Sequence, residues 1–495
     1  MSRVPEWFSD AKLGIVVQWG VASVPGWAPI DGGSPVDRLR AGGWRDFLLR
    51  CPHSSWYANG MRLDGSRVAA HHRAHYGRHV AYERFARRFN DGLDEWDPYD
   101  WAELFAEAGA RYVVMTAKGP DGFLMWPSDH VPADSFVAAR DIVGELATAV
   151  RTTDLKFGIA YSGLLDWTQQ DQPVARGEDL GAPVSGEYGA YVDRHLRELI
   201  DRYQPDLLWG QYGLPPGPPA RTVREYRRSS QDRLTNSGWW LPGSAFPIAP
   251  LRAVAARTRS LRSLVAARMK RAYTIGEPIG TSGDYRTVEY SVPSGIPARP
   301  WELVRALGNS FGYNRDEGSD QIIDGRSLIH LFVDVVARNG NLLLSVGPTP
   351  SGRIPVEQRR PLAEFAEWLA VHGEAVFRTR PWVRAEGVTD QGVPVRFTTR
   401  ENALYAILLD APRALRITLD HIDVRRIPRP KLAKGEEDEF CVRIIGNDRE
   451  IEWDYRDSRL SVNVPGSYRA TAAPVIKMGW RSLAGPRSDF YTDVI

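Results

Sequence analysis

The most constraining feature of this chain is a repeated alternation of short apolar runs with helical patterns. Apolar and β-branched runs bounded by turn residues recur at residues 14–17, 112–116, 157–161, 206–209 and 341–346. Helical spacing of apolar side chains falls between them, at Trp101, Leu104, Phe105 and Ala108 and again at Leu328, Phe332, Val335 and Val336. Because parallel strands need helical crossovers, the alternation predicts an α/β fold, a (β/α)8-like TIM barrel. A doubly wound sheet would alternate similarly, but no glycine-rich phosphate-binding turn follows these runs.

The pattern changes near Thr379. Beyond it come short alternating segments at residues 395–398, 404–409 and 460–464, separated by turn-forming residues. Such segments are typical of an antiparallel β-sandwich. We therefore predict a barrel domain over residues 1–380 and a C-terminal sandwich domain over residues 381–495.

Composition narrows the class of protein and its partners. The 495 residues are 43% hydrophobic and 25% charged, and the net charge is +2. A chain with so little net charge has no global field to attract nucleic acid or a membrane surface. The N-terminal residues lack the basic start and apolar run of a secretory signal, and no run of 18 apolar residues occurs, so we expect a cytoplasmic protein. Cys51 and Cys441 have no metal-binding or redox spacing, and we interpret both as ordinary thiols.

Two segments carry the chemistry of a barrel mouth, where enzymes of this fold place their residues. They are Arg111-Tyr-Val-Val-Met-Thr-Ala-Lys-Gly-Pro-Asp-Gly-Phe123 and Pro205-Asp-Leu-Leu-Trp-Gly-Gln-Tyr-Gly213. Both resemble active-site strands of glycoside hydrolase family 29, the α-L-fucosidases. Residues 7–25, 140–158, 334–348 and 367–377 resemble other parts of that family in the same order. The resemblance implies the barrel, the sandwich and a sugar-binding mouth.

Several positions depart from the family pattern. Gln18 stands where the family has a sugar-binding His, Ser55 stands in place of a Glu, and Gly119 and Pro120 stand in place of paired His. Losing several charge-assisted hydrogen bonds would cost roughly 1.5–3 kcal/mol each in sugar binding. A bare fucoside should bind poorly, and the smaller side chains leave room for a bulkier or less polar small molecule.

The catalytic pair is also altered. Gln211 stands in place of the family's catalytic Asp, and a neutral amide is a poor nucleophile, so we expect the covalent route of retaining hydrolysis to be closed. Glu289, in Gly283-Asp-Tyr-Arg-Thr-Val-Glu-Tyr290, aligns with the family's acid/base Glu, and Arg233 with an Arg that helps to position it. The alternative for Glu289 is a surface ion pair, for example with Arg286. We predict that Glu289, Arg233 and Gln211 form the catalytic group.

The remaining site predictions follow strand ends and matched motifs. We assign substrate binding to Gln18, Trp19, Ser55, Trp56, Lys118, Asp121, Tyr161, Asp166, Trp209 and Tyr212. Asp121 and Asp166 could replace the missing base or pair with barrel Lys and Arg residues, and the sequence does not separate these roles. No cofactor is expected.

A basic insertion at about residues 234–276 has no recognised family counterpart. Residues 251–273 within it carry seven Lys or Arg and no acidic residue. An insertion here should overhang the mouth, where it could bind an anionic group of the substrate. A solvated helix or a dimer contact is an equal alternative.

Histidines at positions 71, 72, 75 and 79 have a spacing that can bind metal. No carboxylate or Cys partner accompanies them, so we expect a half-exposed helix or loop and no metal.

Three functions remain, two of them enzymatic. The leading hypothesis is an enzyme in which Glu289 acts as general acid or base on a bulky small molecule or glycoside, by hydrolysis, elimination or cyclisation. High Arg and Ala usage would suit a bacterial biosynthetic pathway. The alternatives are a non-catalytic carbohydrate- or metabolite-binding protein and a weak α-L-fucosidase with a relocated carboxylate.

Overall fold

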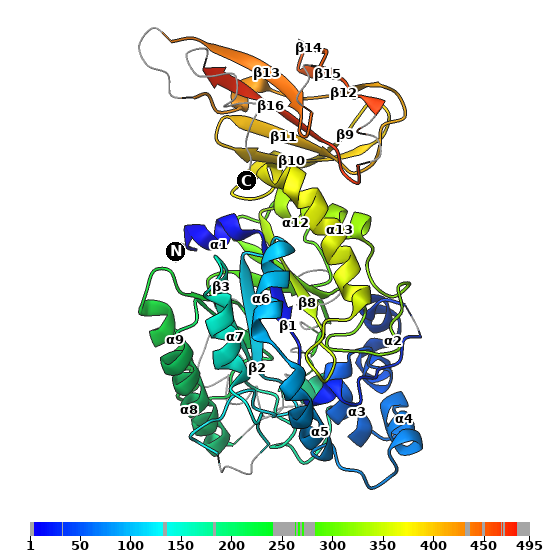
Figure 1. Ribbon diagram of the computed structural model, residues 1–495, viewed down its shortest axis with the longest axis vertical. Helices are drawn as coiled ribbons and strands as arrows, with labels where there is room; N and C mark the ends of the chain where they lie inside the picture. The colour runs from blue at the N-terminus through cyan, green and yellow to red at the C-terminus, as the bar shows by residue number, and fades with distance from the viewer. Residues whose placement is uncertain are drawn as a thin grey trace.

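The computed structural model describes residues 4–31, 33–131, 136–181, 185–240, 283–430, 436–447, 451–466 and 471–482, with the isolated residues 263, 266, 267, 270, 271 and 468. A parallel sheet of eight strands forms the first part of the chain (Figure 1). The strands are β1 (Leu13–Val17), β2 (Tyr112–Lys118), β3 (Lys156–Ser162), β4 (Leu207–Gln211), β5 (Leu234–Thr235), β6 (Arg286–Glu289), β7 (Trp301–Ala306) and β8 (Gly340–Val346). Their order is β5-β4-β3-β2-β1-β8-β7-β6.

The two edges of this sheet meet, so the sheet curls into a barrel. A parallel bridge pairs Asn236 with Tyr285, and the amide of Asp284 donates to the carbonyl oxygen of Thr235 at 2.8 Å. The predicted (β/α) barrel is confirmed. The apolar runs in the sequence correspond to the strands β1, β2, β3, β4 and β8. No such run marked β5, β6 or β7. β5 has only two residues and β6 (Arg-Thr-Val-Glu) only one aliphatic side chain, so neither produces an apolar run.

Helices cover the outside of the barrel. They are α6 (Pro98–Glu107), α7 (Ile142–Val150), α8 (Gly186–Tyr203), α9 (Pro219–Arg228), α12 (Gly325–Ala337) and α13 (Val356–His372). Local sequence fixes their starts: Asp97 caps α6 by accepting from the amide of Tyr99 at 2.8 Å, and Pro98 occupies the first helical position. Asp324 caps α12 in the same way, accepting from the amide of Ser327 at 2.8 Å.

Further helices and 3-10 turns belong to this part of the chain. They are α1 (Glu6–Ala11), α2 (Pro35–Leu49), α3 (Tyr57–Arg62), α4 (Arg67–His75), α5 (Arg84–Gly92) and the 3-10 turns η1 (Val21–Ser23), η2 (Ser54–Trp56), η3 (Leu93–Glu95) and η4 (Gly177–Gly181). Gly43 has φ 69°, and its left-handed backbone kinks α2. No helix in the described ranges combines the length and the apolar character needed to cross a membrane.

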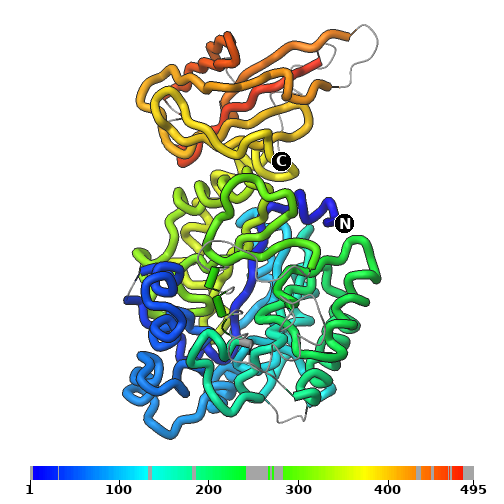
Figure 2. Tube along the Cα trace, turned by 180° about the vertical axis from the view of Figure 1, so that it is seen from behind, coloured from blue at the N-terminus to red at the C-terminus, as the bar shows by residue number. Residues whose placement is uncertain are grey.

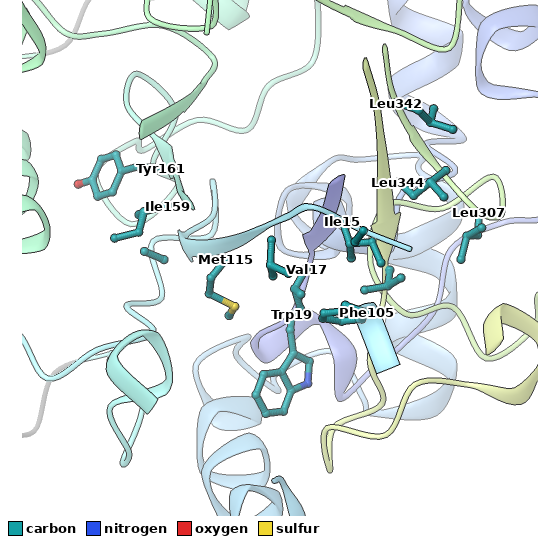
Figure 3. Packing of buried hydrophobic residues seen from close by; sticks show 14 of the residues in the cluster. Ile15, Val17, Trp19, Phe105, Met115, Ile159, Tyr161, Leu307, Leu342 and Leu344 are labelled. Carbon is teal, nitrogen blue, oxygen red and sulfur yellow. The ribbon is translucent and has the colours of Figure 1, made fainter. Parts of the chain in front are cut away.

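Alternation along the strands separates two apolar layers. Ile15, Val17, Met115, Ile159 and Tyr161 belong to the outer layer, which packs against the helices (Figure 3). The inner layer fills the barrel and includes Val16, Tyr112, Val114, Ala160, Leu207, Trp209, Tyr285, Val304 and Leu343. Successive residues of a strand point to opposite faces, so the inner set continues toward the carboxyl ends with Gln18 directly after β1, Gln211 on β4 and Glu289 on β6.

A β-sandwich follows the barrel, as predicted. One antiparallel sheet has the order β13-β16-β11-β10-β9 and the other β12-β15-β14. The strands are β9 (Arg380–Val388), β10 (Pro394–Arg400), β11 (Ala403–Leu408), β12 (Arg416–Leu419), β13 (Asp438–Ile444), β14 (Trp453–Arg456), β15 (Arg459–Asn463) and β16 (Val475–Ser482), with the 3-10 turns η5 (Gly373–Ala375) and η6 (Val424–Arg426). Cys51 and Cys441 are free and buried, one in each part.

The sandwich packs at the end of the barrel where the strands begin (Figures 1 and 2). Arg380 of β9 forms a 2.6 Å ion pair with Asp10, which precedes β1. Glu374 is 2% exposed and accepts from both Lys477 and Arg443 of the sandwich at 2.8 Å. The carboxyl ends of the barrel strands therefore face away from the sandwich.

Candidate active site

A cavity of about 120 Å³ opens at the carboxyl ends of the barrel strands. The residues predicted for the site that line it are Gln18, Ser55, Trp56, Trp209, Gln211, Tyr212 and Glu289. Pro120, which stands in place of a family His, lines it too. They come from distant parts of the sequence, and strand alternation and the loops after the strands bring them together.

Glu289 is the acidic residue among those lining this cavity. Within the described part of the chain, its carboxyl group has no hydrogen bond and no ion pair, and the suggested pair with Arg286 is not formed. Burial raises the pKa of the Glu289 carboxyl from 4.5 to about 7. A carboxyl group with such a pKa holds or releases a proton near neutral pH, as a general acid or base must.

Gln211 lines the same cavity from the end of β4. Its side-chain amide has no hydrogen-bond partner among the described residues. The backbone turns sharply after both functional strands, because Tyr212 and Tyr290 have left-handed φ values of 58° and 56°. Non-glycine residues rarely adopt this conformation, and it is concentrated at functional sites. Here it ends β4 and β6 in the same way, immediately after Gln211 and Glu289.

Two residues after β5 fix the positions of both strand ends. Gly210 donates its amide to the Asn236 side-chain oxygen at 2.7 Å, and the Asn236 amide donates back to the Gly210 carbonyl at 3.1 Å. The Ser237 hydroxyl accepts from the amide of Thr287 at 3.0 Å. Asn236 therefore holds the residue before Gln211, and Ser237 holds the strand that carries Glu289.

Aromatic side chains form much of the cavity wall. Trp44, Phe47, Trp56, Trp209, Tyr212, Trp240 and Phe311 all line it. Trp56 donates its indole N–H to the Tyr212 hydroxyl at 3.0 Å, and Trp209 donates to the buried Glu302 at 2.7 Å. These bonds fix the rings, so the cavity has rigid, largely apolar walls.

Glu302 lies inside the barrel below the cavity. It is fully buried and also accepts from Tyr112 at 2.9 Å and from Tyr285 at 3.3 Å. Burial raises the pKa of its carboxyl to about 7. Glu302 supports Trp209 from beneath and does not line the cavity.

The structure separates Arg233 from Glu289. Arg233 precedes β5, so it lies at the amino end of the barrel, where its guanidinium donates to Ser229 at 2.7 Å and to Gln204. It also stacks over Tyr226, 5.1 Å from the ring centroid. The prediction that Arg233 positions Glu289 is therefore wrong, because a two-residue strand separates Arg233 from the mouth.

Lys118, Tyr161 and Asp166 do not line the cavity. Lys118 and Asp166 form a buried ion pair of 2.8 Å, and the Lys118 ammonium lies 5.0 Å from the Tyr161 ring centroid. Tyr161 is fully buried in the outer layer and hydrogen-bonds with His195 at 3.1 Å. Of the two roles open to Asp166, the structure places it in the pair with barrel Lys118.

Trp19 and Asp121 line a second, smaller cavity beside the first. Trp19 packs in the outer layer and donates to the carbonyl oxygen of Thr349 at 2.8 Å. Asp121 accepts from the Tyr82 hydroxyl at 2.8 Å. The two cavities share Gln18, Ser55 and Pro120.

Sequence reasoning missed several wall residues. Asn236 and Ser237 fell inside the predicted insertion, although residues 234–240 form β5 and part of the wall. Thr287 stands two residues before Glu289, and that spacing could have identified it. Trp44, Phe47 and His53 come from helices and loops, where no sequence period indicates the mouth. Burial lowers the pKa of His53 to about 3, which keeps its ring neutral.

Most of the basic segment at residues 251–273 lies outside the described residues. Of those described, Ser263 donates to Glu178 at 3.1 Å, and the carbonyl oxygen of Ala266 accepts from Trp44 at 2.9 Å. Because Trp44 lines the cavity, these contacts bring part of the segment to the outer side of the wall.

The histidines predicted as a helix or loop lie on and after α4. His72 is buried between the Tyr57 hydroxyl at 3.1 Å and the Val80 carbonyl at 2.8 Å. His71 stacks between Trp27 and His75, with ring centroids 3.9 and 4.0 Å apart. The described ranges contain no group of three or more His, Cys, Asp or Glu arranged to hold a metal ion.

A parallel barrel with its cavity at the carboxyl ends of the strands is the architecture of barrel enzymes. A family model described as Alpha-L-fucosidase matches residues 1–374. Tissue alpha-L-fucosidase of Rattus norvegicus is 27% identical over 455 residues, which span 91% of this chain and 83% of the relative. Tissue alpha-L-fucosidase of Homo sapiens is 29% identical over 424 residues, with 83% and 76% covered.

Solved structures agree with the sequence matches. Thermotoga maritima alpha-fucosidase in complex with fucose is 30% identical, with a TM-score of 0.76 over 96% of this chain and 97% of that chain. An alpha-L-fucosynthase of Thermotoga maritima is 31% identical, with a TM-score of 0.78 over 96% and 97%. The chain belongs to the α-L-fucosidase family of glycoside hydrolases.

Proposed function

We propose that the chain is a diverged member of this family that acts on a bulky, neutral small molecule or glycoside, with Glu289 as general acid or base. One observation carries the proposal: Glu289 is the acid lining the cavity, it has no described hydrogen-bond or ion-pair partner, and its pKa is about 7. A structural carboxylate would be paired, because an unpaired buried charge is costly.

The missing second carboxyl group supports a changed mechanism. Retaining hydrolysis needs a nucleophilic carboxylate and an acid/base carboxyl about 5–5.5 Å apart. Gln211 supplies an amide at the end of β4, and no other acid lines the main cavity among the described residues. Single-displacement hydrolysis, elimination and cyclisation need no nucleophilic carboxylate and can use Glu289 for a proton transfer, and they are the reactions that we propose.

The walls favour a neutral and partly apolar substrate. No Lys or Arg is among the described residues that line the main cavity, and aromatic rings cover much of it. Gln18, Ser55 and Gln211 offer uncharged hydrogen bonds. An anionic substrate group, a cytoplasmic location and a biosynthetic pathway stay predictions, the first of them resting on residues 251–273.

Ordinary fucoside hydrolysis is the second candidate, because the matched relatives are alpha-L-fucosidases. A panel of aryl glycosides that includes an aryl α-L-fucoside and sugars with larger apolar substituents separates the two. We expect the parent to release phenol fastest from a bulky glycoside, with Glu289→Gln slowing it by about 10²–10⁴-fold.

The matched control is Glu317→Gln. Burial also raises the pKa of Glu317 to about 7, but one oxygen of its carboxyl accepts from both Asn309 and Ser310, at 2.7 and 2.8 Å. A Gln oxygen can keep both bonds, so this variant should retain activity. If the parent hydrolyses the aryl α-L-fucoside fastest, and if this activity is lost in Glu289→Gln but kept in Glu317→Gln, the protein is an ordinary fucosidase instead. Ligand binding without turnover of any compound would favour the non-catalytic binding protein.

A further inference from the structure

The small cavity beside the main one has the size of a water site. Its volume is about 30 Å³, and it shares Gln18, Ser55 and Pro120 with the main cavity. A cavity of this volume holds a water molecule when two to four polar groups surround it. The shared residues border both cavities, so the small cavity lies next to the one that Glu289 lines.

Polar groups without partners line the small cavity. Thr116 is 3% exposed, and its hydroxyl oxygen has no hydrogen-bond partner in the described part of the chain. The side chains of Gln18 and Ser55 likewise have none there. An unpaired buried hydroxyl costs about 1–3 kcal/mol, so a bound water that accepts or donates at Thr116 would remove this cost.

Asp121 supplies a carboxylate to the same cavity. Its Oδ2 accepts from the Tyr82 hydroxyl at 2.8 Å, and its Oδ1 accepts from the amide of Phe123 at 3.3 Å. Asp121 forms no ion pair with a described residue. Its two neutral partners hold the carboxylate in place and leave lone pairs that can accept a proton.

The substitution at Gly119 helps to keep this space open. A Cβ atom at Gly119 would lie 3.2 Å from Oδ1 of Asp121, which is tighter than ordinary contact. Gly119 and Pro120 both line the small cavity. Two positions with lost polar side chains therefore border a cavity that contains a carboxylate.

We propose that the small cavity holds the attacking water and that Asp121 is its general base, in a single-displacement hydrolysis with Glu289 as the acid. This inference rests on the proposed function. The water oxygen bonds to the anomeric carbon while the bond to the leaving oxygen breaks, its electron pair going to that oxygen. Asp121 takes a proton from the water, and Glu289 gives one to the leaving oxygen. One displacement inverts the anomeric configuration.

The charges around the two carboxyl groups suit these roles. Burial raises the pKa of Asp121 to about 6; the charge of Asp166 adds to this rise, whereas Tyr82, Phe123 and Lys118 oppose it. Glu289 faces Tyr212 and Tyr290 and titrates at about 7. The base must be ionised and the acid protonated, so activity should rise with pH near 6 and fall near 7.

A crystal structure of the parent chain tests the water site. We expect one ordered water within hydrogen-bond distance of Thr116 Oγ1 and the Asp121 carboxylate, and we expect Thr116→Val to lose it. Ser345→Ala is the matched control, because Ser345 is another buried barrel hydroxyl without a described partner and lines neither cavity. A dry cavity in the parent would overturn the inference.

Stereochemistry tests the base. With the panel glycoside that the parent hydrolyses best, proton NMR should show the inverted anomer first. Asp121→Asn should lower kcat by about 10²–10⁴-fold and abolish the rise near pH 6, leaving the fall near pH 7. Retention, or a loss below threefold, would overturn the assignment. Absence of any hydrolysis would also overturn it, whereas Glu289-dependent elimination or cyclisation would leave the proposed function standing.

Discussion

Polar side chains on two sides of the barrel mouth differ in whether they have partners. At the ends of β2 and β3, Lys118 and Asp166 pair with each other at 2.8 Å and are at most 1% exposed. At the ends of β4 and β6, Gln211 and Glu289 face the cavity with no described side-chain partner. The Lys118–Asp166 pair is complete as folded, so these two groups support the barrel, whereas the hydroxyl of Thr116, on the same strand β2, is unpaired at the small cavity. The second side is incomplete without a ligand, which is where chemistry is expected.

Breaking the paired side should have the largest effect. Lys118→Met leaves the Asp166 carboxylate buried without its cation, and such a change lowers the free energy of unfolding by about 3–5 kcal/mol. Urea denaturation measures this loss. Gln211→Met is the control from the other side and should change stability by less than about 1 kcal/mol. Equal losses in both variants would remove the distinction between the two sides.

Neutralising Glu289 should give a pH-dependent gain in stability. An unfolded Glu titrates near 4.5, whereas the folded one titrates at about 7, so the stability of the parent falls as pH rises between these values. Glu289→Gln lacks this loss, and above pH 7 it should be more stable than the parent by up to about 3 kcal/mol. Unfolding curves at pH 5 and pH 8 test this; a constant difference between the two proteins would contradict it.

A smaller change in stability is expected when the hydroxyl of Thr116 is removed, and its sign shows whether the small cavity holds water. If the small cavity holds water, Thr116→Val removes one of its bonds and should cost about 1 kcal/mol. If the cavity is dry, the same change removes an unpaired hydroxyl and should stabilise the fold. Thermal unfolding gives the sign, which is the informative result.

The smallest effect is expected at Arg233. Its contacts with Ser229, Gln204 and Tyr226 are partly exposed and lie at the opposite end of the barrel. Arg233→Ala should cost at most about 1 kcal/mol and leave turnover of the panel glycosides unchanged. A large fall in kcat with normal stability would restore the predicted catalytic role.

The barrel was predictable because long buried strands and amphipathic helices leave strong periodic patterns. The short strands β5 and β6 leave almost no periodic pattern. The sequence therefore did not show that Arg233 lies at the amino end of the barrel or that Asn236 and Ser237 hold the strand ends. Lys118 shows a second limit of prediction from sequence. The pairing of β2 with β3 shifts register between Thr116 and Lys118. Such an irregularity redirects side chains, and the Lys118 ammonium contacts Asp166 instead of the mouth.

Tyr161 shows a third limit. It ends a predicted strand and matches the family pattern, but alternation places it with Ile159 in the outer layer (Figure 3). The face of a strand cannot be assigned from sequence when both faces are buried, because both then carry apolar residues. Gln211 and Glu289 were found because their motifs, and not their periodicity, identified them.

The seam where β5 meets β6 has a consequence for how this fold can change. Asn236 and Tyr285 form the bridge there, and the chain runs from residue 240 to residue 283 between the two edges. Lengthening a connection adds only about 0.6 kcal/mol for each doubling. New sequence can therefore enter the barrel wall at this point, next to Ser237, without breaking a long ladder of hydrogen bonds. A family member can acquire a new neighbour for the residue at the end of β6 here while the other seven strand pairings stay intact.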